Sequence, residues 1–219
     1  MSDLAEQRAI TEIALAAVAD RGFVLAGAGA IREHGLIDRP TEDVDLFTVV
    51  VDADVLASSA RSVVEALRGA GYAAELSMSA QLFARISVAG ARTVVTVDMG
   101  VDWRRDPPAE LEVGPVLSRA DAIANKVLAV YGRMEARDYL DLDAIRRSGV
   151  MSDAELLESA RERDPGFDVD VFAGLLARVE TLSPLEVAAY GVTGEALADV
   201  SKRLASWARE LGAGSPHGE

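Results

Sequence analysis

The sequence predicts an α+β fold in which a small mixed sheet, surrounded by helices, is followed by a helical C-terminal part. Strand-like runs alternate with helical patterns only up to about residue 110, and helical periodicity dominates from residue 118 onwards. Half of the 219 residues are hydrophobic, which suits an ordinary buried core. We therefore expect an α+β core over 1–112, a helical domain over 115–212 and a frayed tail over 213–219.

Local side-chain patterns predict the elements of the first half in order. Apolar residues at spacings of three to five indicate helices, and dense β-branched or aromatic residues indicate strands. Asp52 or Asp54 marks the start of the second helix, Gly69 follows its last periodic residue, and Gly90 supplies a hairpin turn. The predicted elements are a helix over 4–19, a strand over 23–25, one or two helical turns over 30–34, a strand over 43–51, a helix over 52–69 and strands over 72–77, 81–88 and 93–99.

The second half reads as helical throughout. An irregular stretch runs from Asp106-Pro107-Pro108 to Gly114-Pro115, and Pro165-Gly166 and Ser183-Pro184 separate the later helices. If the chain has an active cleft, we expect it between the halves, where two surfaces converge on one ligand. The predicted helices cover 118–133, 136–148, 152–163, 168–181 and 194–211.

The residue counts exclude several kinds of site. Because the chain has no cysteine, it has no disulfide framework, thiolate zinc site or thiol nucleophile, and its two histidines disfavour a histidine-built metal centre. No stretch approaches the roughly 20 apolar residues of a membrane span, and charged residues interrupt the first 20 positions. We expect a cytoplasmic protein without a membrane partner.

The charge balance argues against a protein that coats nucleic acid. The formal net charge is −14, whereas binding to phosphates needs a basic surface. Only the segment 101–150 is nearly neutral. If the chain contacts a polyanion, the basic residues of this segment are the candidates, although they are equally well explained as solvated helix charges: Arg104, Arg105, Arg119, Lys126, Arg133, Arg137, Arg146 and Arg147.

Two aspartates of a predicted strand form the first candidate site. Asp43 and Asp45 are two residues apart, so their carboxylates point from the same face, while Val44 and Leu46 point into the sheet. Such close like charges repel, which makes sense if they share Mg²⁺, a cation that also binds substrate phosphates. Taken alone, the pattern also fits a solvated strand edge.

Neighbouring residues favour the metal site. Gly27, with Gly29 close behind, lies between a strand and a short helix, where backbone N–H groups can approach phosphate oxygens. Thr41 places a hydroxyl two residues before Asp43. A glycine-bearing turn followed by Thr-x-Asp-x-Asp on the next strand indicates a site for phosphate and metal.

Two sequence blocks resemble a known family. The first comprises Gly27-Ala28-Gly29-Ala30, His34-Gly35 and Arg39-Pro40-Thr41-Glu42-Asp43-Val44-Asp45-Leu46-Phe47. The second comprises Ala124-Asn125-Lys126-Val127-Leu128-Ala129 and Arg137-Asp138-Tyr139-Leu140-Asp141-Leu142. Together they resemble the DNA-polymerase-beta-like nucleotidyltransferases, and more closely the AbiEii/MenT branch of bacterial toxins. The blocks cover 27–142; the segment 150–219 carries no motif that we can match.

The resemblance implies roles for residues of the first half. Asp43 and Asp45 would hold Mg²⁺, or Mn²⁺ in its place, against the triphosphate, and Asp98 would be the third metal-binding carboxylate. Asp98 has a second explanation as a strand-end cap. Thr41 would contact a phosphate or the attacking group, and Gly27 and Ala28 would bind the nucleotide. The family usually has glycine where this chain has Ala28, which would cost about 1 kcal/mol and weaken nucleotide binding if that position needed a positive φ or a close approach of phosphate.

Lys126 and Asp141 are the candidates from the second block. Lys126 is one of two lysines among 22 basic residues, and an ammonium suits a triphosphate as a compact charge. Asp141 lies 15 residues later, about four turns along a continuous helix, so both would face one cleft unless the helix breaks near 133–137. Asp138 is the alternative acid. For both aspartates, a cap or an ion pair with Arg137 or Arg146 is the structural explanation.

The resemblance implies an enzyme of a toxin–antitoxin system. It would transfer nucleotides, with CTP favoured, to the 3′ end of tRNA and release pyrophosphate by in-line attack on the α-phosphorus. An antitoxin would be its protein partner. Two alternatives stay open, a nucleotidyltransferase for a small cationic acceptor of the aminoglycoside kind and an inactive interaction module.

Overall fold

The computed structural model describes residues 3–39, 41, 43–91 and 94–214, which form two compact units. The first unit comprises 1–35 and 40–122, and the second comprises 36–39 and 123–219. The predicted combination of a mixed sheet with helices is confirmed. Within the described residues, no helix has both the length and the apolar character that crossing a membrane requires.

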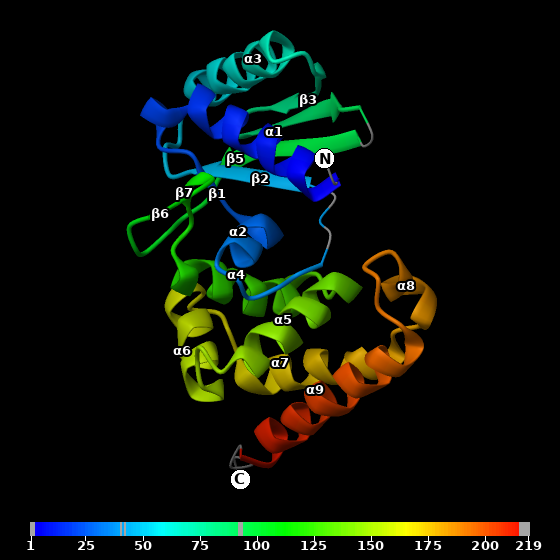
Figure 1. The fold of residues 1–219 in the computed structure, drawn as a ribbon. Helices are drawn as coiled ribbons and strands as arrows, with labels where there is room; N and C mark the ends of the chain where they lie inside the picture. Colours follow the sequence, from blue (N-terminus) through cyan, green and yellow to red (C-terminus); the bar gives the residue numbers. More distant parts are fainter. Residues whose placement is uncertain (1–2, 40, 42, 92–93, 215–219) are drawn as a thin grey trace. The chain divides into compact units, whose positions relative to one another are not determined.

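The first unit contains the whole sheet. Its strands follow the order β3-β4-β5-β2-β1-β7-β6, with β2 parallel to β5 and antiparallel to β1. The helices α1 and α3 pack against each other and against the sheet (Figure 1). The elements are α1 Asp3–Ala17, the 3-10 helix η1 Ala19–Arg21, β1 Val24–Leu25, α2 Gly27–Glu33, β2 Asp43–Thr48, α3 Ala53–Gly69, β3 Ala73–Ala80, β4 Phe83–Ala89, β5 Val94–Val101, β6 Ala109–Leu111 and β7 Gly114–Val116.

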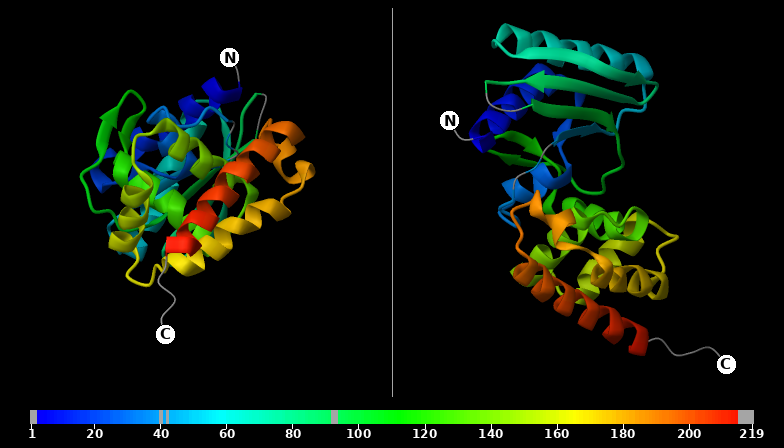
Figure 2. Two further views of the ribbon diagram at one scale, coloured as in Figure 1. Left: turned by 90° about the horizontal axis from the view of Figure 1, so that it is seen from below. Right: turned by 90° about the vertical axis from the view of Figure 1, so that its right-hand side faces the viewer.

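The second unit is helical over its described residues. Four aromatic rings form a row in which neighbouring rings are tilted or edge-on and their centroids lie 4.9–5.6 Å apart: Tyr131, Phe167, Phe172 and Trp207. Both views of Figure 2 show α7 running beside α9. The elements are α4 Arg119–Gly132, α5 Ala136–Ser148, α6 Asp153–Arg163, α7 Val169–Ala177, the 3-10 helix η2 Arg178–Thr181, α8 Pro184–Ala188 and α9 Gly194–Gly214.

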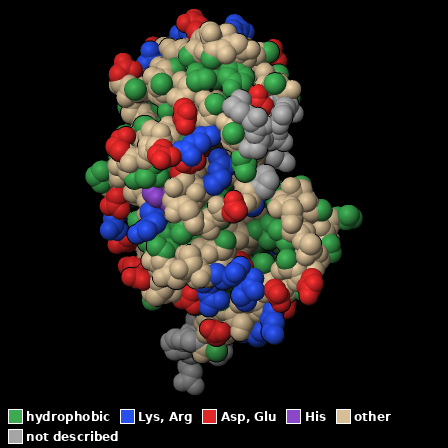
Figure 3. Space-filling view, in the orientation of Figure 1, with side chains coloured by type: hydrophobic (Ala, Val, Ile, Leu, Met, Phe, Trp, Pro, Cys, Tyr) green, Lys and Arg blue, Asp and Glu red, His purple; other side chains and the backbone are tan. Residues whose placement is uncertain are grey.

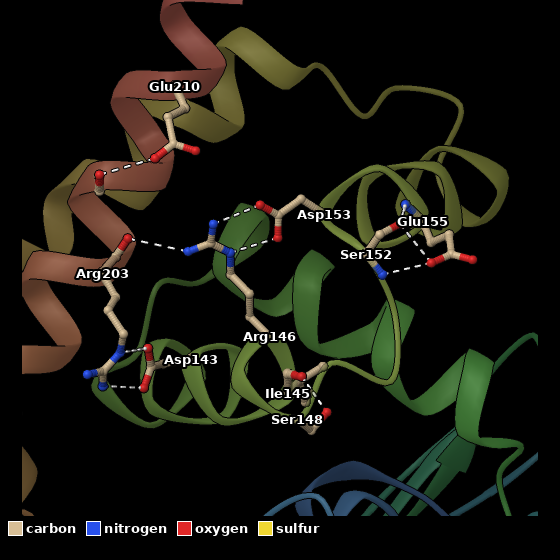
Figure 4. Close-up of polar contacts among 10 residues, drawn as sticks. Asp143, Ile145, Arg146, Ser148, Ser152, Asp153, Glu155, Arg203 and Glu210 are labelled. Carbon is tan, nitrogen blue, oxygen red and sulfur yellow. Dashed lines mark hydrogen bonds and ion pairs between the residues drawn. The ribbon is translucent and has the colours of Figure 1, made fainter.

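Ion pairs from α5 join three helices of this unit (Figure 4). Arg146 binds Asp153 at the start of α6 through two contacts of 2.7 Å, and its guanidinium carbon lies 4.8 Å from the centroid of the Trp207 ring. One turn earlier, Asp143 accepts two hydrogen bonds of 2.7 Å from Arg203 of α9. Planar guanidinium forks thereby fix the directions of α6 and α9 around α5.

Four sequence predictions need correction. α2 begins at Gly27, not at Ala30, so Gly29 lies inside the helix. The stretch expected to be irregular contains the β6–β7 hairpin, because a φ of +118° at Gly114 allows the turn. Ser183-Pro184 does separate helical segments, but Pro184 also begins α8, a short helix missing from the prediction. α9 includes residues 213–214 of the predicted tail, while 215–219 lie outside the described residues.

Gly29 lets α2 pack closely on β1. A Cβ at this position would lie 2.9 Å from Leu25 Cδ1, and Leu25 is buried. The side chain of Leu25 cannot retreat easily, because it belongs to the close-packed core between β1 and the helices. This contact sets the entry of α2, and with it the position of Gly27.

We therefore expect Gly29→Ala to lower the free energy of unfolding by about 1–3 kcal/mol through overpacking. Gly69→Ala is the matched control, because a Cβ there meets open space at the end of α3 and should raise stability by up to about 1 kcal/mol. Urea denaturation followed by circular dichroism measures both. Equal stability changes for the two variants would contradict the packing role of Gly29.

Candidate functional site

Three aspartates share one face of the sheet in the first unit. Burial alternates along β2, with Asp43 and Asp45 half-buried and Val44 and Leu46 buried, which confirms that the two acids share a face. In the parallel register of β2 and β5, Asp45 lies beside Asp98. Residues paired in this way project their side chains from the same face, so Asp98 is the carboxylate beside the pair.

Arg85 of β4 occupies the other side of Asp98. Its Nε and Nη2 donate hydrogen bonds of 2.7 Å to Oδ1 and Oδ2 of Asp98. The hydrogen bond and charge of Asp98, opposed by partial burial, raise the pKa of Arg85, and the charges of Asp43 and Asp45 raise it further. A cation supplied by the chain itself therefore lies in the field of all three acids.

Gly27 lies directly against Asp45. A Cβ at residue 27 would overlap the Asp45 carboxylate, and the φ of Gly27 is +56°, which favours glycine. The two backbone segments are also joined there, since the Ala26 N–H donates a hydrogen bond of 2.8 Å to the Asp45 carbonyl. The first residue of α2 thus forms one wall of the acidic site.

Ala28 fits its position without strain. It is buried in the first turn of α2, and Met134 is the one non-glycine residue with positive φ in the part of the chain that the structure describes. The need for a positive φ, one of the two conditions under which alanine would be costly here, is therefore not met. The departure from the family pattern is compatible with the local backbone.

A side-chain network fixes the segment that enters β2. Arg32 Nη1 donates to Thr41 Oγ1 at 3.0 Å and to Gln7 Oε1 at 2.9 Å. Thr41 Oγ1 donates to Gln7 Oε1 at 3.0 Å, and Gln7 Nε2 donates to the Thr41 and Asp43 carbonyls. The network holds the Thr41 hydroxyl next to the acidic strand. No sequence motif pointed to Gln7 or Arg32, because each binds a residue of a different element.

The second unit brings Lys126 and Asp141 together. The helix breaks between Gly132 and Ala136, so the two residues lie on successive helices, α4 and α5. Lys126 Nζ lies 2.7 Å from Asp141 Oδ2, and Arg39 donates to both Asp141 oxygens at 2.6 and 2.7 Å. The predicted pairing of Arg137 or Arg146 with Asp141 is wrong; Arg39 is the guanidinium partner.

Burial and charge act in opposite directions on Asp141. Its side chain is fully buried, which raises the pKa, but the hydrogen bond from Arg39 and the charges of Lys126 and Arg39 outweigh burial and hold the pKa below its usual value. The carboxylate is therefore a weak base. Its geometry suits it to orient the Lys126 ammonium, which is itself only 5% exposed.

Asp138 performs a different task at the start of α5. It accepts hydrogen bonds of 2.9 and 2.8 Å from Arg133 and one of 3.2 Å from the Glu135 N–H. These contacts cap the helix and connect it to the end of α4. Arg137 instead pairs with Glu135. Of the two candidate acids, Asp141 is the one that contacts Lys126.

Two of the three aspartates, Asp43 and Asp45, suit a divalent cation. Asp43 and Asp45 present carboxylate oxygens from one face, and these are the ligands that Mg²⁺ prefers. Both oxygens of Asp98 accept hydrogen bonds from Arg85. Among the residues described, no group of three or more His, Asp or Glu side chains is arranged around a metal position.

The basic residues of 101–150 were the candidates for contact with a polyanion. On the face seen in Figure 3, Lys and Arg side chains stand in small groups with Asp and Glu nearby. Most of the candidates for polyanion contact pair with carboxylates: Arg105 with Asp106, Lys126 with Asp141, Arg133 with Asp138, Arg137 with Glu135 and Arg146 with Asp153.

Comparison with known proteins identifies relatives. The model of a family described as nucleotidyl transferase AbiEii toxin, type IV TA system, matches residues 8–213. No curated protein sequence gives a significant match. The solved structures that match include JHP933 from Helicobacter pylori, with 19% sequence identity and a TM-score of 0.58, covering 97% of this chain and 94% of that one. Another H. pylori protein, described provisionally as a nucleotidyltransferase, shares 17% identity with a TM-score of 0.56, covering 97% and 96%.

The contact between Gly27 and Asp45 predicts a specific defect. In Gly27→Ala the new methyl group would displace the Asp45 carboxylate, so we expect Mn²⁺ binding, measured by electron paramagnetic resonance, to weaken at least about tenfold. Gly35→Ala is the matched control, since Gly35 also has a positive φ but faces open space. The idea fails if both variants bind Mn²⁺ equally well.

The buried cluster around Asp141 predicts a pH-dependent contribution to stability. Asp141→Asn leaves Arg39 and Lys126 buried without their counter-ion and should cost about 3–5 kcal/mol at pH 7. Because the folded-state pKa of Asp141 lies below the unfolded value near 3.8, this contribution is complete above that pH and is lost as pH falls through the folded pKa.

Urea titrations between pH 7 and pH 3 measure the difference between wild type and Asp141→Asn. The exposed pair of Glu158 and Arg161 provides the control, and Glu158→Gln should cost less than about 1 kcal/mol at every pH. A constant difference for Asp141→Asn down to pH 3, or one no larger than that of the control, would refute the assignment.

Proposed function

The chain belongs to the AbiEii family of nucleotidyltransferase toxins, and from this premise we propose that it transfers nucleotides from NTP, with CTP favoured, to the 3′ end of tRNA. The family is part of type IV toxin–antitoxin systems, which implies an antitoxin partner. We further propose that the transfer depends on Mg²⁺ and blocks translation and growth. The placement of Asp43 and Asp45 on one face of β2, with Asp45 against Gly27, carries the proposal.

The first unit supplies the metal and phosphate contacts in this proposal. Asp43 and Asp45 would hold a divalent cation, which when bound neutralises charge on the triphosphate. The backbone N–H groups of Gly27 and Ala28 open α2 beside these acids and would bind phosphate oxygens. The Thr41 hydroxyl, fixed by Gln7 and Arg32, would contact a phosphate or the attacking group.

The second unit would supply the cation Lys126 for the triphosphate. Its ammonium is held by Asp141, and Asp141 by Arg39, so the direction of the lysine is set before substrate arrives. Such preorganisation lowers the cost of stabilising the negative charge that develops in the transition state. Asp141 acts in this proposal as a positioning residue, because its lowered pKa makes it a poor proton acceptor.

The reaction would be an in-line displacement. A hydroxyl oxygen of the acceptor would attack the α-phosphorus while a carboxylate takes the hydroxyl proton, the bond from the α-phosphorus to the oxygen that bridges it to the β-phosphorus would break, and pyrophosphate would leave with the electron pair. The chain's residues orient the two reactants and exclude competing geometries. No covalent enzyme intermediate is required, in keeping with the absence of cysteine from the sequence.

One observation favours a second candidate, a small cationic acceptor such as an aminoglycoside. The net charge is −14, and most basic residues expected to contact a polyanion are paired with acids. An RNA acceptor needs basic contacts that this pairing reduces. The inactive-module alternative is weakened, since Ala28 fits the helical backbone.

Transfer assays separate these candidates. Purified chain, Mg²⁺ and each labelled NTP are incubated with total tRNA or with an aminoglycoside, and we expect label in tRNA, most from CTP. Asp43→Asn should reduce transfer at least about a hundredfold by removing a metal ligand, whereas Asp54→Asn, an exposed acid of α3, should retain it.

Each outcome decides between functions. Label in the aminoglycoside alone would replace tRNA by a small acceptor. No transfer from any NTP to either acceptor, together with no Mg²⁺-dependent NTP binding by calorimetry, would refute the enzyme proposal. Growth arrest on expression that Asp43→Asn abolishes would support the toxin.

A further inference from the structure

Arg85 is a charged residue at the acidic face to which neither the sequence motifs nor the proposed reaction assigns a role. It lies on β4, and the antiparallel register of β4 and β5 sets it directly beside Asp98. Asp98 in turn lies beside Asp45 of β2. The three residues therefore form one row across three adjacent strands, with the arginine at one end and the acid of the Thr-x-Asp-x-Asp motif at the other.

Arg85 binds both carboxylate oxygens of Asp98. A single guanidinium donates to both carboxylate oxygens at 2.7 Å, which is the bidentate arrangement that binds a carboxylate most strongly. The Asp98 side chain is only 11% exposed, so its charge needs a partner. Phe83 supports the arginine, with its ring centroid 5.6 Å from the guanidinium carbon.

The same guanidinium stands at the edge of the whole acidic group. Its side chain is 44% exposed, so it can exchange partners without breaking core packing. The charges of Asp43 and Asp45 reach it as well as that of Asp98. A bound divalent cation and Arg85 are thus two positive charges that compete for one set of carboxylates.

We propose that Arg85 is a positioning residue that keeps Asp98 out of the metal's ligand set, so that Asp43 and Asp45 alone hold the divalent cation. The inference rests on the metal site of the proposed function. Arg85 provides the positive charge that balances the third carboxylate. Removing Arg85 should therefore strengthen metal binding, because Asp98 becomes available as a third ligand.

Metal binding to the full chain tests this without any need for turnover. Mn²⁺ affinity is measured by electron paramagnetic resonance for wild type, Arg85→Gln, Asp98→Asn, the double variant and Asp45→Asn. We expect Arg85→Gln to tighten binding roughly fivefold, Asp98→Asn to change it less than about twofold, and Asp45→Asn to weaken it at least tenfold.

The double variant distinguishes two ways in which Arg85 can weaken metal binding: it holds the Asp98 carboxylate, or its positive charge repels the cation. If Arg85 acts by holding Asp98, the gain of Arg85→Gln disappears when Asp98→Asn is added. Arg85→Lys keeps the charge but cannot form the two-pronged pair, and should lie between wild type and Arg85→Gln. Arg61→Gln, which removes an exposed arginine from α3, is the matched control and should leave Mn²⁺ affinity unchanged.

Three results would overturn the proposal. The first is that Asp98→Asn weakens Mn²⁺ binding as much as Asp45→Asn does, which would make Asp98 a ligand in the wild type. The second is that Arg85→Gln leaves the Mn²⁺ affinity unchanged. The third is that the double variant keeps the full gain in affinity of Arg85→Gln. If Asp45→Asn has no effect, the metal site of the proposed function fails together with this inference; a loss confined to the Arg85 predictions leaves that site intact.

Discussion

The acidic site depends on the close approach of one glycine to one carboxylate. After β1 the chain turns into α2 at Gly27, and the turn passes directly over Asp45. A hydrogen bond from the Ala26 N–H to the Asp45 carbonyl ties the two strands at this point. Because no side chain fits at residue 27, the start of α2 and the direction of Asp45 are fixed together. Packing of Gly29 on Leu25 holds the helix in that place.

Paired charges recur at four buried aspartates of this acidic chain. An aspartate in the interior is tolerable only if its charge is matched and its oxygens are hydrogen-bonded. Arginine meets both needs with one planar group, which agrees with the preference of this chain for arginine over lysine. Lys126 is the exception and shares its aspartate with an arginine. The pairs are Arg85 with Asp98, Arg133 with Asp138, Arg39 with Asp141 and Arg203 with Asp143.

The sequence predicted what local patterns encode. Alternation along β2 was sufficient to place Asp43 and Asp45 on one face, and helix periodicity located α3 and α5 within a residue or so. The pairing of Arg85 with Asp98 was predictable, because a hairpin that turns near Gly90 places residue 85 opposite residue 98. The contacts of Thr41 with Gln7 and of Asp141 with Arg39 were not predictable. Their partners come from distant parts of the chain and leave no local signal.

The short segment Leu36–Arg39 has a consequence for how the chain can be divided. It follows α2 of the first unit and precedes β2, yet it belongs to the second unit, where Arg39 binds Asp141 and stacks 5.1 Å from the centroid of the Tyr190 ring. A C-terminal fragment that starts after the sheet would therefore lack one of its own internal parts. The helical unit is discontinuous in sequence, and its folding must recruit a piece of polypeptide that was synthesised before the acidic strand.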